Sequence, residues 1–373
     1  MKKLLVLYAS YGSGHKSVGM YIKDYYEANG YEVMTIDLLA YSMPIVGMFT
    51  KKANEFLMTT IPSLWSLLYF AFDNRLTGTI YQQFSLKLFD NKKLREEIVS
   101  FNPDLVIATH FYGSGLIAKY KEKNILNTKL VTVITDYKSH EVWLNDVRNT
   151  DAIVVSGMDE KFRLMKYGFK ANQIYTSGIP ILPSSLENVD KKKLFKHFKL
   201  KGDRPVILFF AGGGNGATNN LKYLKLLIKE NINADVLFIA GKNKRSKSKA
   251  QELVKKYDAT NVKVFGFVNV VDFYNVCDFV ITKPGGAQAT ECLYYRKPMV
   301  LIKGNGGQEI ENRMFLIKKG YALGFISPYG FINQVNKLLK QKKTLDKMVN
   351  NIDKLKQEKS MEKLFKMSEK LLK

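Results

Sequence analysis

Short runs of β-branched and aliphatic residues alternate with longer amphipathic stretches along this chain, and the alternating series occurs twice. This pattern is typical of parallel strands joined by crossover helices, so it predicts two doubly wound α/β domains. In the first half the apolar runs predict strands at residues 4–9, 33–37, 105–109, 131–135, 153–156 and 174–177. In the second half they predict strands at residues 206–210, 236–240, 262–265, 279–282, 299–302 and 323–326.

The pattern pauses between the two sets of strands. Residues 181–204 contain the basic run Lys191–Lys193 and no predicted strand, and Pro205 then opens a fully apolar run. A chain of 373 residues also exceeds the size at which a single hydrophobic core keeps growing. We therefore expect an N-terminal domain at residues 1–180, a linker at 181–204, a C-terminal domain at 205–335 and basic helices at 336–373.

No segment is predicted to cross a membrane. The longest apolar stretch, Ile61–Phe72, is interrupted by polar residues and is shorter than the roughly 20 residues that a spanning helix needs. The spacing of Cys277 and Cys292 fits neither a zinc ligand pair nor a redox pair, and no signal peptide opens the chain. These features lead us to expect a cytoplasmic protein.

The chain carries a formal charge of +24, and the excess lies in its second half. Residues 1–180 have 21 Lys and Arg against 17 Asp and Glu, whereas residues 181–373 have 37 against 17. Nucleic acid, anionic lipid or a phosphorylated substrate would each explain the excess, and so would lysine-rich solvated helix faces. A nucleic-acid-binding protein would carry a recognisable module or aromatics interleaved with Arg, and neither is present, so no nucleic-acid partner is expected.

The first predicted strand ends in a glycine turn, Tyr11-Gly12-Ser13-Gly14-His15-Lys16-Ser17. Its backbone can approach a ligand and offer N–H groups to an anion at the start of a helix. The turn lacks the GK[ST] of a Walker A loop, and Ser17 stands where a Rossmann fingerprint has its third glycine. We take His15 as a functional candidate that faces the ligand, against the alternative of an unliganded glycine turn.

A second glycine loop, Gly212 to Ala217, formally matches the G-x-G-x-x-A of dinucleotide-binding domains. An NAD site also needs an acidic residue about 20 residues further on, at the end of the next strand, to bind the ribose. The next predicted strand ends in Ala240-Gly241-Lys242, so NAD is not supported. Gly213 and Asn215 remain candidates for contact with another nucleotide.

The third loop, Thr282-Lys283-Pro284-Gly285-Gly286, joins a predicted strand to a helix N-terminus. The free amides and the dipole of that helix end suit a diphosphate. Glu291, about one and a half turns into the helix, is placed to accept both hydroxyls of a ribose. The alternative is that the glycines only turn the chain and that Glu291 is a surface residue.

The fourth loop, Gly304–Asn312, contains glycines followed by polar side chains suited to sugar hydroxyls. Taken alone it could be an ordinary surface loop. It follows the next strand in the series, however, and adjacent strand ends would place it over the same ligand as the Pro-Gly-Gly turn.

These loops, in this order, resemble the family of monogalactosyl- and processive diacylglycerol glycosyltransferases, which is related to the bacterial transferase that adds N-acetylglucosamine to lipid-linked muramyl peptide. The resemblance covers nearly the whole chain. It rests on Tyr11-Gly12-Ser13-Gly14-His15, Thr135-Asp136 with His140 and Trp143, Ser177-Gly178-Ile179-Pro180, Gly241-Lys242-Asn243, Gly266-Phe267-Val268, Ile281-Thr282-Lys283-Pro284-Gly285-Gly286, and Gly307-Gln308-Glu309 with Asn312.

The resemblance implies the GT-B fold, in which two Rossmann-like doubly wound domains face a central cleft. It implies that the first domain binds the acceptor and the second a UDP-sugar, and that the anomeric centre is inverted without a metal ion. The chain agrees in lacking the Asp-x-Asp pair that metal-dependent sugar transferases use. We therefore expect no cofactor and no metal, with UDP-glucose as donor and diacylglycerol as acceptor.

The resemblance also assigns roles to residues. The backbone around Phe267 and Val268 should hold uracil, Gly285 and Gly286 the diphosphate, Glu291 the ribose, and Gln308 with Glu309 the hexose hydroxyls. The other expected nucleotide-sugar contacts are Gly14, Gly213, Asn215, Lys283, Pro284 and Asn312. His15 should be the general base; because Ser10 stands where plant members have an Asp, Asp136 and His110 are the alternative bases.

The acyl chains of the acceptor imply contact with a membrane surface. The apolar region 43–89 fits an interfacial patch that includes Trp65, Phe70 and Phe72, and the alternative is that most of these are core residues of one or two helices. Basic residues would add attraction to anionic lipid at about 1 kcal/mol per charge. We expect a peripheral protein at the cytoplasmic face of the cell membrane.

The sequence leaves open the identity of the donor sugar and of the acceptor. The donor could be UDP-galactose, because a C4 epimer changes a single hydroxyl, and the acceptor could be lipid-linked muramyl peptide or a soluble molecule. If a finished glucolipid re-enters the site, the same machinery adds further sugars.

Overall fold

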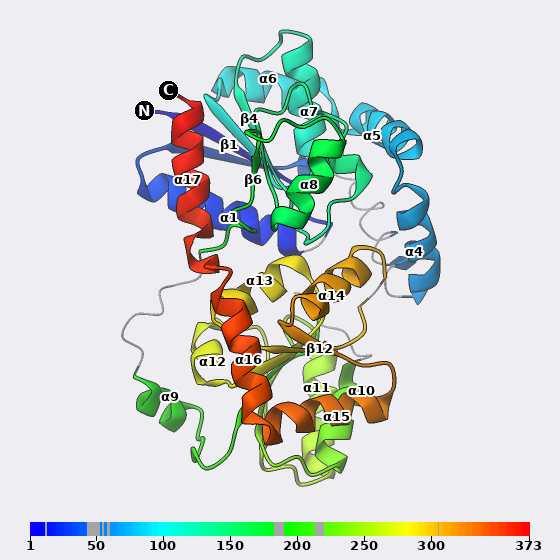
Figure 1. Ribbon diagram of the computed structural model, residues 1–373, viewed down its shortest axis with the longest axis vertical. Helices are drawn as coiled ribbons and strands as arrows, with labels where there is room; N and C mark the ends of the chain where they lie inside the picture. Colours follow the sequence, from blue (N-terminus) through cyan, green and yellow to red (C-terminus); the bar gives the residue numbers. More distant parts are fainter. Residues whose placement is uncertain are drawn as a thin grey trace. The chain divides into compact units, whose positions relative to one another are not determined.

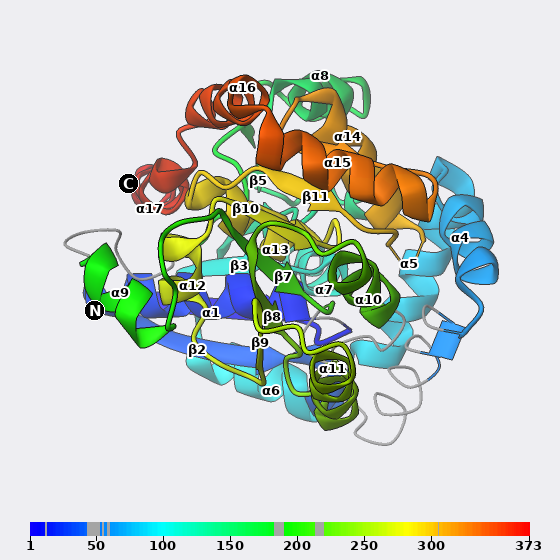
Figure 2. The same cartoon turned by 90° about the horizontal axis from the view of Figure 1, so that it is seen from below.

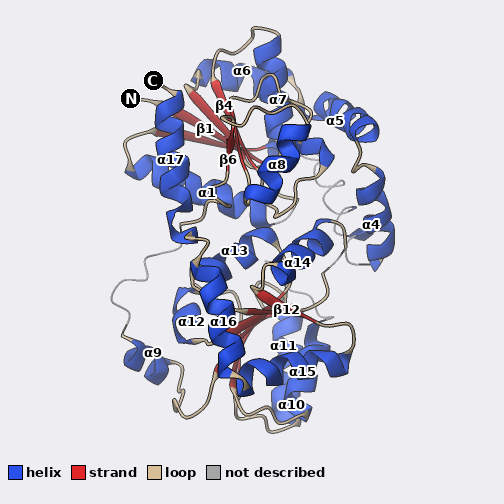
Figure 3. Cartoon of the chain, viewed as in Figure 1, coloured by secondary structure: helices blue, strands red, loops and turns tan. Residues whose placement is uncertain are grey.

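The structure is a computed structural model that describes residues 1–11, 13–42, 53, 56–57, 60–182, 190–212, 220–304 and 306–373 (Figure 1). The chain forms two compact units. Unit 1 comprises Met1–Leu182, Asn305–Asn312 and Glu358–Lys373, and unit 2 comprises Pro183–Gly304 and Arg313–Gln357. Each unit contains one parallel six-stranded sheet with helices packed around it (Figure 3). The predicted doubly wound α/β architecture is therefore confirmed.

The sheet of unit 1 has the order β2-β1-β3-β4-β5-β6. Its strands are β1 (Lys3–Tyr8), β2 (Glu32–Asp37), β3 (Leu105–Ala108), β4 (Lys129–Val133), β5 (Ala152–Val154) and β6 (Ile174–Tyr175). All six predicted strands are present. Several end one or two residues earlier than predicted, because the chain leaves the ladder there and turns into the loops that carry polar side chains.

Helices surround this sheet. They are α1 (Ser13–Ala28), α2 (Leu38–Ser42), α4 (Pro62–Ala71), α5 (Arg75–Phe89), α6 (Lys92–Phe101), α7 (Phe111–Glu122), α8 (Met158–Lys166) and α17 (Ser360–Leu371), with the short 3-10 helix η1 (Glu141–Trp143). The C-terminal helix α17 packs on α1, where the Tyr26 hydroxyl donates to Ser368 Oγ over 2.7 Å and the Phe365 ring lies 5.1 Å from the Tyr26 ring. The last helix of the chain thus completes the core of unit 1.

The sheet of unit 2 has the order β12-β11-β10-β7-β8-β9. Its strands are β7 (Val206–Phe210), β8 (Asp235–Ile239), β9 (Val262–Phe265), β10 (Phe279–Thr282), β11 (Met299–Leu301) and β12 (Ala322–Gly324). The helices are α9 (Lys191–His197), α10 (Leu221–Lys229), α11 (Lys244–Lys256), α12 (Val271–Val276), α13 (Gly286–Tyr294), α15 (Pro328–Lys340) and α16 (Lys342–Asp353), and the 3-10 helix η3 (Gln357–Lys359) follows them. Helix α14 (Gln308–Lys318) has residues in both units.

The central strands of both sheets are buried on both faces, which explains their continuous apolar sequences. In unit 2 the rings of Phe209, Phe238 and Phe279 are almost completely inaccessible to solvent and form the middle of the core. The predicted bounds at residues 180 and 204 stay predictions, and α9 lies between them. Within the described ranges, no helix has the length and apolar character needed to span a bilayer.

Candidate functional site

Three candidate residues of unit 1, His15, His110 and Asp136, lie just beyond the carboxyl ends of its strands. His15 follows β1, Thr109 and His110 follow β3, and Thr135 and Asp136 follow β4. Strands β1, β3 and β4 are neighbours in the sheet, and ligands of such sheets bind at this edge. The topology therefore brings these side chains into one group.

The ring of His15 is held by residues that follow β3 and β4. Its Nδ1 lies 2.7 Å from the carbonyl oxygen of Thr109 and 2.8 Å from Oγ1 of Thr135. The Thr109 hydroxyl in turn donates to the carbonyl oxygen of His15 over 3.0 Å. A carbonyl oxygen only accepts hydrogen bonds, so Nδ1 carries a proton and, in the neutral ring, Nε2 bears the lone pair.

The protonation of His15 is coupled to that of Asp136. Burial lowers the pKa of His15, while the nearby Asp136 carboxylate and the hydrogen bond to Thr109 act in the opposite direction. Burial raises the pKa of Asp136, and the charge of His15 and a hydrogen bond from Asn312 oppose this rise. A lowered pKa leaves the His15 ring neutral at pH 7, so Nε2 is available to accept a proton.

His110 has a different arrangement. Its Nδ1 caps α7 by accepting a hydrogen bond from the backbone N–H of Tyr112 over 3.3 Å, and burial lowers its pKa well below the usual value. The neutral ring therefore carries its proton on Nε2 and can only donate from that nitrogen. The rings of His15 and His110 pack edge to face, 4.6 Å apart, so His110 forms one wall around the candidate base.

Asp136 and Asn312 are joined inside unit 1. The Asn312 amide donates from Nδ2 to Asp136 Oδ1 over 2.8 Å, and its Oδ1 accepts from the backbone N–H of Tyr137 over 2.8 Å. Asn312 is completely buried. Both ends of its amide thus make protein contacts, which fixes the position of the Asp136 carboxylate.

The loop residues before Asn312 also pack inside unit 1. Gly307 has a φ of +53°, and a Cβ there would lie 2.8 Å from Trp65 Nε1, so a side chain at this position would be strained. Its N–H donates to Ser66 Oγ over 3.2 Å. Gln308 and Glu309 open α14, and Gln308 Oε1 is buried with no hydrogen-bond partner among the described residues. A ligand hydroxyl would satisfy this oxygen.

In unit 2 the Pro-Gly-Gly turn leads directly into α13. Gly285 is the N-cap residue, with φ −74° and ψ 137°, and no side chain caps the helix. A Cβ at Gly285 would meet nothing within 4 Å, so the space in front of this turn is open. Pro284 is buried and Lys283 is half-buried beside it. A ligand can therefore approach Gly285 at the start of α13, and the first amides of a helix have no partner within the helix, as a diphosphate site requires.

The carboxylate of Glu291 on α13 belongs to a small polar network. The Tyr274 hydroxyl, from α12, donates to Glu291 Oε2 over 3.3 Å and accepts from Gln288 Nε2 over 2.5 Å. Tyr274 is completely buried, and its ring stacks on Tyr295 with centroids 4.6 Å apart and an interplanar angle of 10°. The stacked ring fixes the hydroxyl that contacts Glu291.

The loop after β9 carries the residues expected to hold the base of the nucleotide. The Phe267 side chain is 69% exposed, and the Lys242 ammonium lies 4.8 Å from the centre of its ring. Val268 is half-buried next to it. Lys242 follows β8 and Phe267 follows β9, so both lie at the carboxyl edge of the sheet in unit 2.

The remaining candidates are dispersed. Gly14 is the second residue of α1, and Trp65 and Phe70 lie on α4, where Trp65 is half-buried and Phe70 is exposed. Phe72 follows α4 and packs against Tyr81, with ring centroids 5.0 Å apart. Gly213 and Asn215 lie outside the described residues. No group of three or more His, Cys, Asp or Glu side chains suited to a metal occurs in the part of the chain that the structure describes.

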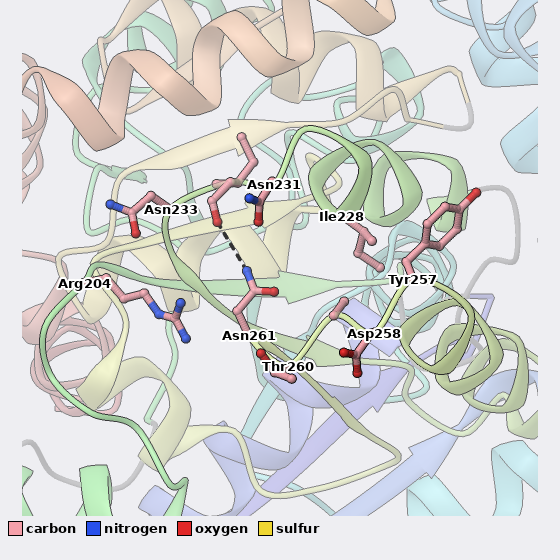
Figure 4. Close-up of a pocket in the computed structure, with 10 residues that line it drawn as sticks. Arg204, Ile228, Asn231, Asn233, Tyr257, Asp258, Thr260 and Asn261 are labelled. Atoms are coloured by element: carbon pink, nitrogen blue, oxygen red, sulfur yellow. Dashed lines mark hydrogen bonds between the residues drawn. The ribbon is translucent and has the colours of Figure 1, made fainter.

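A hollow of about 660 Å³ in unit 2 lies at the opposite edge of the sheet, beside the amino ends of β7, β8 and β9 (Figure 4). Its walls include Arg204, Asn231, Asp258 and Asn261, and Asn261 Nδ2 donates to the carbonyl oxygens of Ile232 and Ala234. None of the candidate site residues lines it. The Asn261 side chain thereby stabilises the turn that precedes β8.

Sequence reasoning gave no role to three residues that position the candidates. Thr109 and Thr135 hold His15, and Tyr274 holds Glu291. Thr135 directly precedes Asp136 at a predicted strand end, which is a signal that could have identified it. Nothing in the sequence distinguishes Tyr274 from the other tyrosines of the chain.

Two protein-family models match the chain, one in its first half and one in its second half. Residues 15–181 match the model of the monogalactosyldiacylglycerol (MGDG) synthase family, and residues 190–355 match that of the glycosyl transferases group 1. Among solved structures, the chain is similar to MurG from Acinetobacter baumannii, with a TM-score of 0.64 and 12% identity over 99% of both chains. It is also similar to a UDP-GlcNAc 2-epimerase from Neisseria meningitidis, with a TM-score of 0.62 and 13% identity over 99% of this chain and 100% of that chain. These likenesses confirm the GT-B fold.

Curated relatives are similar along nearly the full length. The processive diacylglycerol beta-glucosyltransferase of Bacillus pumilus (strain SAFR-032) is 30% identical over 359 residues, which are 95% of this chain and 91% of that protein. The enzyme of the same name from Bacillus subtilis (strain 168) is 27% identical over 94% of this chain and 90% of its own length. With this identity and coverage, the chain belongs to the family of the processive diacylglycerol β-glucosyltransferases.

Proposed function

We propose that this protein transfers glucose from UDP-glucose to diacylglycerol, and then to the glucolipid it has made, with inversion at the anomeric carbon. The acceptor oxygen forms a bond to C1 of glucose while the bond from C1 to the diphosphate oxygen breaks. The acceptor proton moves to the protein and UDP leaves. A single displacement of this kind inverts the anomeric centre.

The observation that carries this proposal is the tautomer of His15. Its Nδ1–H is engaged by the carbonyl of Thr109, which leaves the lone pair of Nε2 for the acceptor hydroxyl. His110 has the opposite tautomer because its Nδ1 accepts from Tyr112, so its Nε2 cannot take a proton in the neutral ring. Of the two histidines at this strand edge, His15 is the one arranged as a base.

Asp136 acts in this scheme as the electrostatic partner of His15. Its charge stabilises the imidazolium that forms when His15 takes the proton, and Asn312 holds the carboxylate in place. A base in this position contributes on the order of 10²–10⁴-fold to the rate.

The donor is proposed to bind in unit 2. The open N-terminus of α13 at Gly285 and Gly286 would stabilise the charge of the departing UDP, since helix amides and dipole favour an anion there. Glu291 would accept the ribose hydroxyls, and the backbone near Phe267 and Val268 would bind uracil. These contacts of the nucleotide belong to unit 2, whereas Gln308 and Glu309, the proposed contacts of the hexose hydroxyls, belong to unit 1.

Membrane contact is proposed through α4 and α5 of unit 1. Helix α5 exposes an apolar stripe at a spacing of four residues, Leu76 at 72%, Ile80 at 58% and Phe84 at 61%. Helix α4 adds exposed apolar side chains, among them Leu67 and Phe70. Such a surface binds the interfacial region of a bilayer, and the formal charge of +24 adds attraction to anionic lipid. We propose peripheral binding at the cytoplasmic face of the cell membrane.

UDP-galactose is the second candidate donor, because residues 15–181 match the MGDG synthase model. One assay separates the candidates: transfer of radiolabelled sugar from UDP-glucose or UDP-galactose into diacylglycerol in anionic vesicles, with EDTA present. Labelled glucolipid from UDP-glucose alone is the expected result. Labelled product from UDP-galactose alone would show that UDP-galactose is the donor. UDP binding without product from either UDP-sugar would refute the lipid acceptor.

A further inference from the structure

A groove in unit 2 gathers five lysines around an apolar floor. It has a volume of about 960 Å³ and lies between β12, the end of α14, and helices α15 and α16. Strand β12 is the edge strand of its sheet. Helix α15 leads directly into α16 (Figures 1 and 2). The lysines are Lys337, Lys340, Lys342, Lys343 and Lys347, and the floor is formed by Ile317, Ala322, Leu323 and Met348.

The helical spacing explains why these residues meet. On α16 the groove residues Lys343, Lys347 and Asn351 recur every four positions, so they share one face of the helix. Asp346, the acidic residue within this stretch, does not line the groove. The face of α16 that lines the groove is therefore cationic, and the buried Met348 lies on the same helix.

Within the described ranges, these ammonium groups have no acidic partners. Among the described residues, none of the five lysines forms an ion pair with an Asp or Glu side chain, and Asp353 at the end of α16 is engaged by Arg296 over 2.5 and 2.7 Å. Several like charges around one concave surface raise the local electrostatic potential, because their repulsion is not compensated. A bound anion would relieve this repulsion.

The apolar residues that line the groove determine which kind of anion fits it. An inorganic anion would occupy a small part of the 960 Å³ volume and would leave the partly exposed side chains of Ile317 and Leu323 against water. A phospholipid presents a phosphate beside a glycerol backbone and acyl chains, so it can meet lysines and apolar side chains together. The chain belongs to a family of enzymes named for a lipid acceptor, so such molecules are present where it acts.

We propose that this groove binds the phosphate headgroup and upper acyl chains of an anionic phospholipid. The site is separate from the proposed donor site, because none of its lining residues is among the candidate catalytic or nucleotide-sugar contacts. The inference rests on the proposed function only in assuming that the protein works at a membrane. Its occupant would hold unit 2 at anionic lipid independently of the apolar surface of α4 and α5.

The test is calorimetric titration of the full chain with dihexanoylphosphatidylglycerol below its micellar concentration. The variant is Lys340→Gln, Lys343→Gln, Lys347→Gln. The matched control is Lys249→Gln, Lys255→Gln, Lys256→Gln on α11, which removes the same charge from exposed positions outside the groove. We expect the groove variant to bind at least about tenfold more weakly and the control to stay within about twofold of the wild type. Unchanged UDP binding by both variants shows that unit 2 is folded.

Further titrations identify the source of the anion. Dihexanoylphosphatidylcholine should not bind, and inorganic phosphate should not displace the phosphatidylglycerol at comparable concentration. Equal losses in the two triple variants would overturn the proposal, since binding would then follow net charge. Displacement by inorganic phosphate would overturn it as well, because the groove would be a simple anion site. If UDP binds but the short-chain lipid does not, the groove inference fails and the proposed transfer reaction stands.

Discussion

The Nδ1 of His15 lies 2.7 Å from the carbonyl oxygen of Thr109, and this contact determines which nitrogen of the ring can act as a base. Thr109 follows β3 and His15 follows β1, so two neighbouring strands fix the tautomer. The Thr109 hydroxyl binds the His15 carbonyl in return, which prevents the start of α1 from shifting relative to β3. The proposed mechanism therefore depends on backbone geometry as well as on the identity of residue 15.

Replacing His15 by Ala should lower kcat for glucosyl transfer by on the order of 10²–10⁴, because the acceptor proton would lose its base. The Kd for UDP should not change, since His15 belongs to unit 1 and the residues proposed to hold uracil, ribose and diphosphate belong to unit 2. Initial-rate kinetics and calorimetry measure the two quantities. The control is His197→Ala, an exposed histidine of α9, which should keep full activity. Unchanged turnover in the His15 variant would refute its role.

The pH dependence of kcat/KM should report the lowered pKa of His15. The base must be unprotonated, and its pKa lies below the usual 6.5, so activity should persist below pH 6.5 and decline as the pH falls through the lowered pKa. Asp136 opposes this lowering, so Asp136→Asn should move the acid limb to still lower pH. The measurement is a pH profile of both proteins at constant ionic strength. An acid limb that moves to higher pH in the variant would contradict the coupling.

Tyr274→Phe should weaken UDP binding about fivefold, because the hydrogen bond that holds Glu291 contributes roughly 1 kcal/mol. The fold should survive, since the ring keeps its stacking on Tyr295. Calorimetry with 2′,3′-dideoxy-UDP separates positioning from general damage: this ligand lacks the hydroxyls that Glu291 would bind. It should bind equally to both proteins. A similar loss for both nucleotides would show that Tyr274 only supports the fold.

The double substitution Ile80→Glu, Phe84→Glu should reduce partition into anionic vesicles at least about tenfold. Burial of two large apolar side chains in the bilayer interface contributes about 1.5–3 kcal/mol each, and the carboxylates remove this contribution. The control is Gln83→Glu, Lys87→Gln, which changes the net charge of α5 equally at exposed positions outside the stripe. Cosedimentation with vesicles measures both variants. Equal losses would mean that charge alone governs membrane binding.

The sequence by itself determined the fold and most of the candidate residues. The twelve strands in the described part of the chain follow from apolar runs, because parallel strands buried on both faces need continuous apolar sequence. The glycine-containing turns after β1 and β10 mark places where the backbone can approach a ligand. Both signals are local, and local signals are readable from one chain.

Only the tertiary structure decided how these residues are held. The tautomer of His15 depends on Thr109, 94 positions away, and the carboxylate of Asp136 is fixed by Asn312, 176 positions away. The proton positions on His15 and His110 differ because one ring nitrogen faces a carbonyl and the other caps a helix. Such contacts depend on which strands become neighbours, and the strand order is a property of the folded chain that no local pattern records.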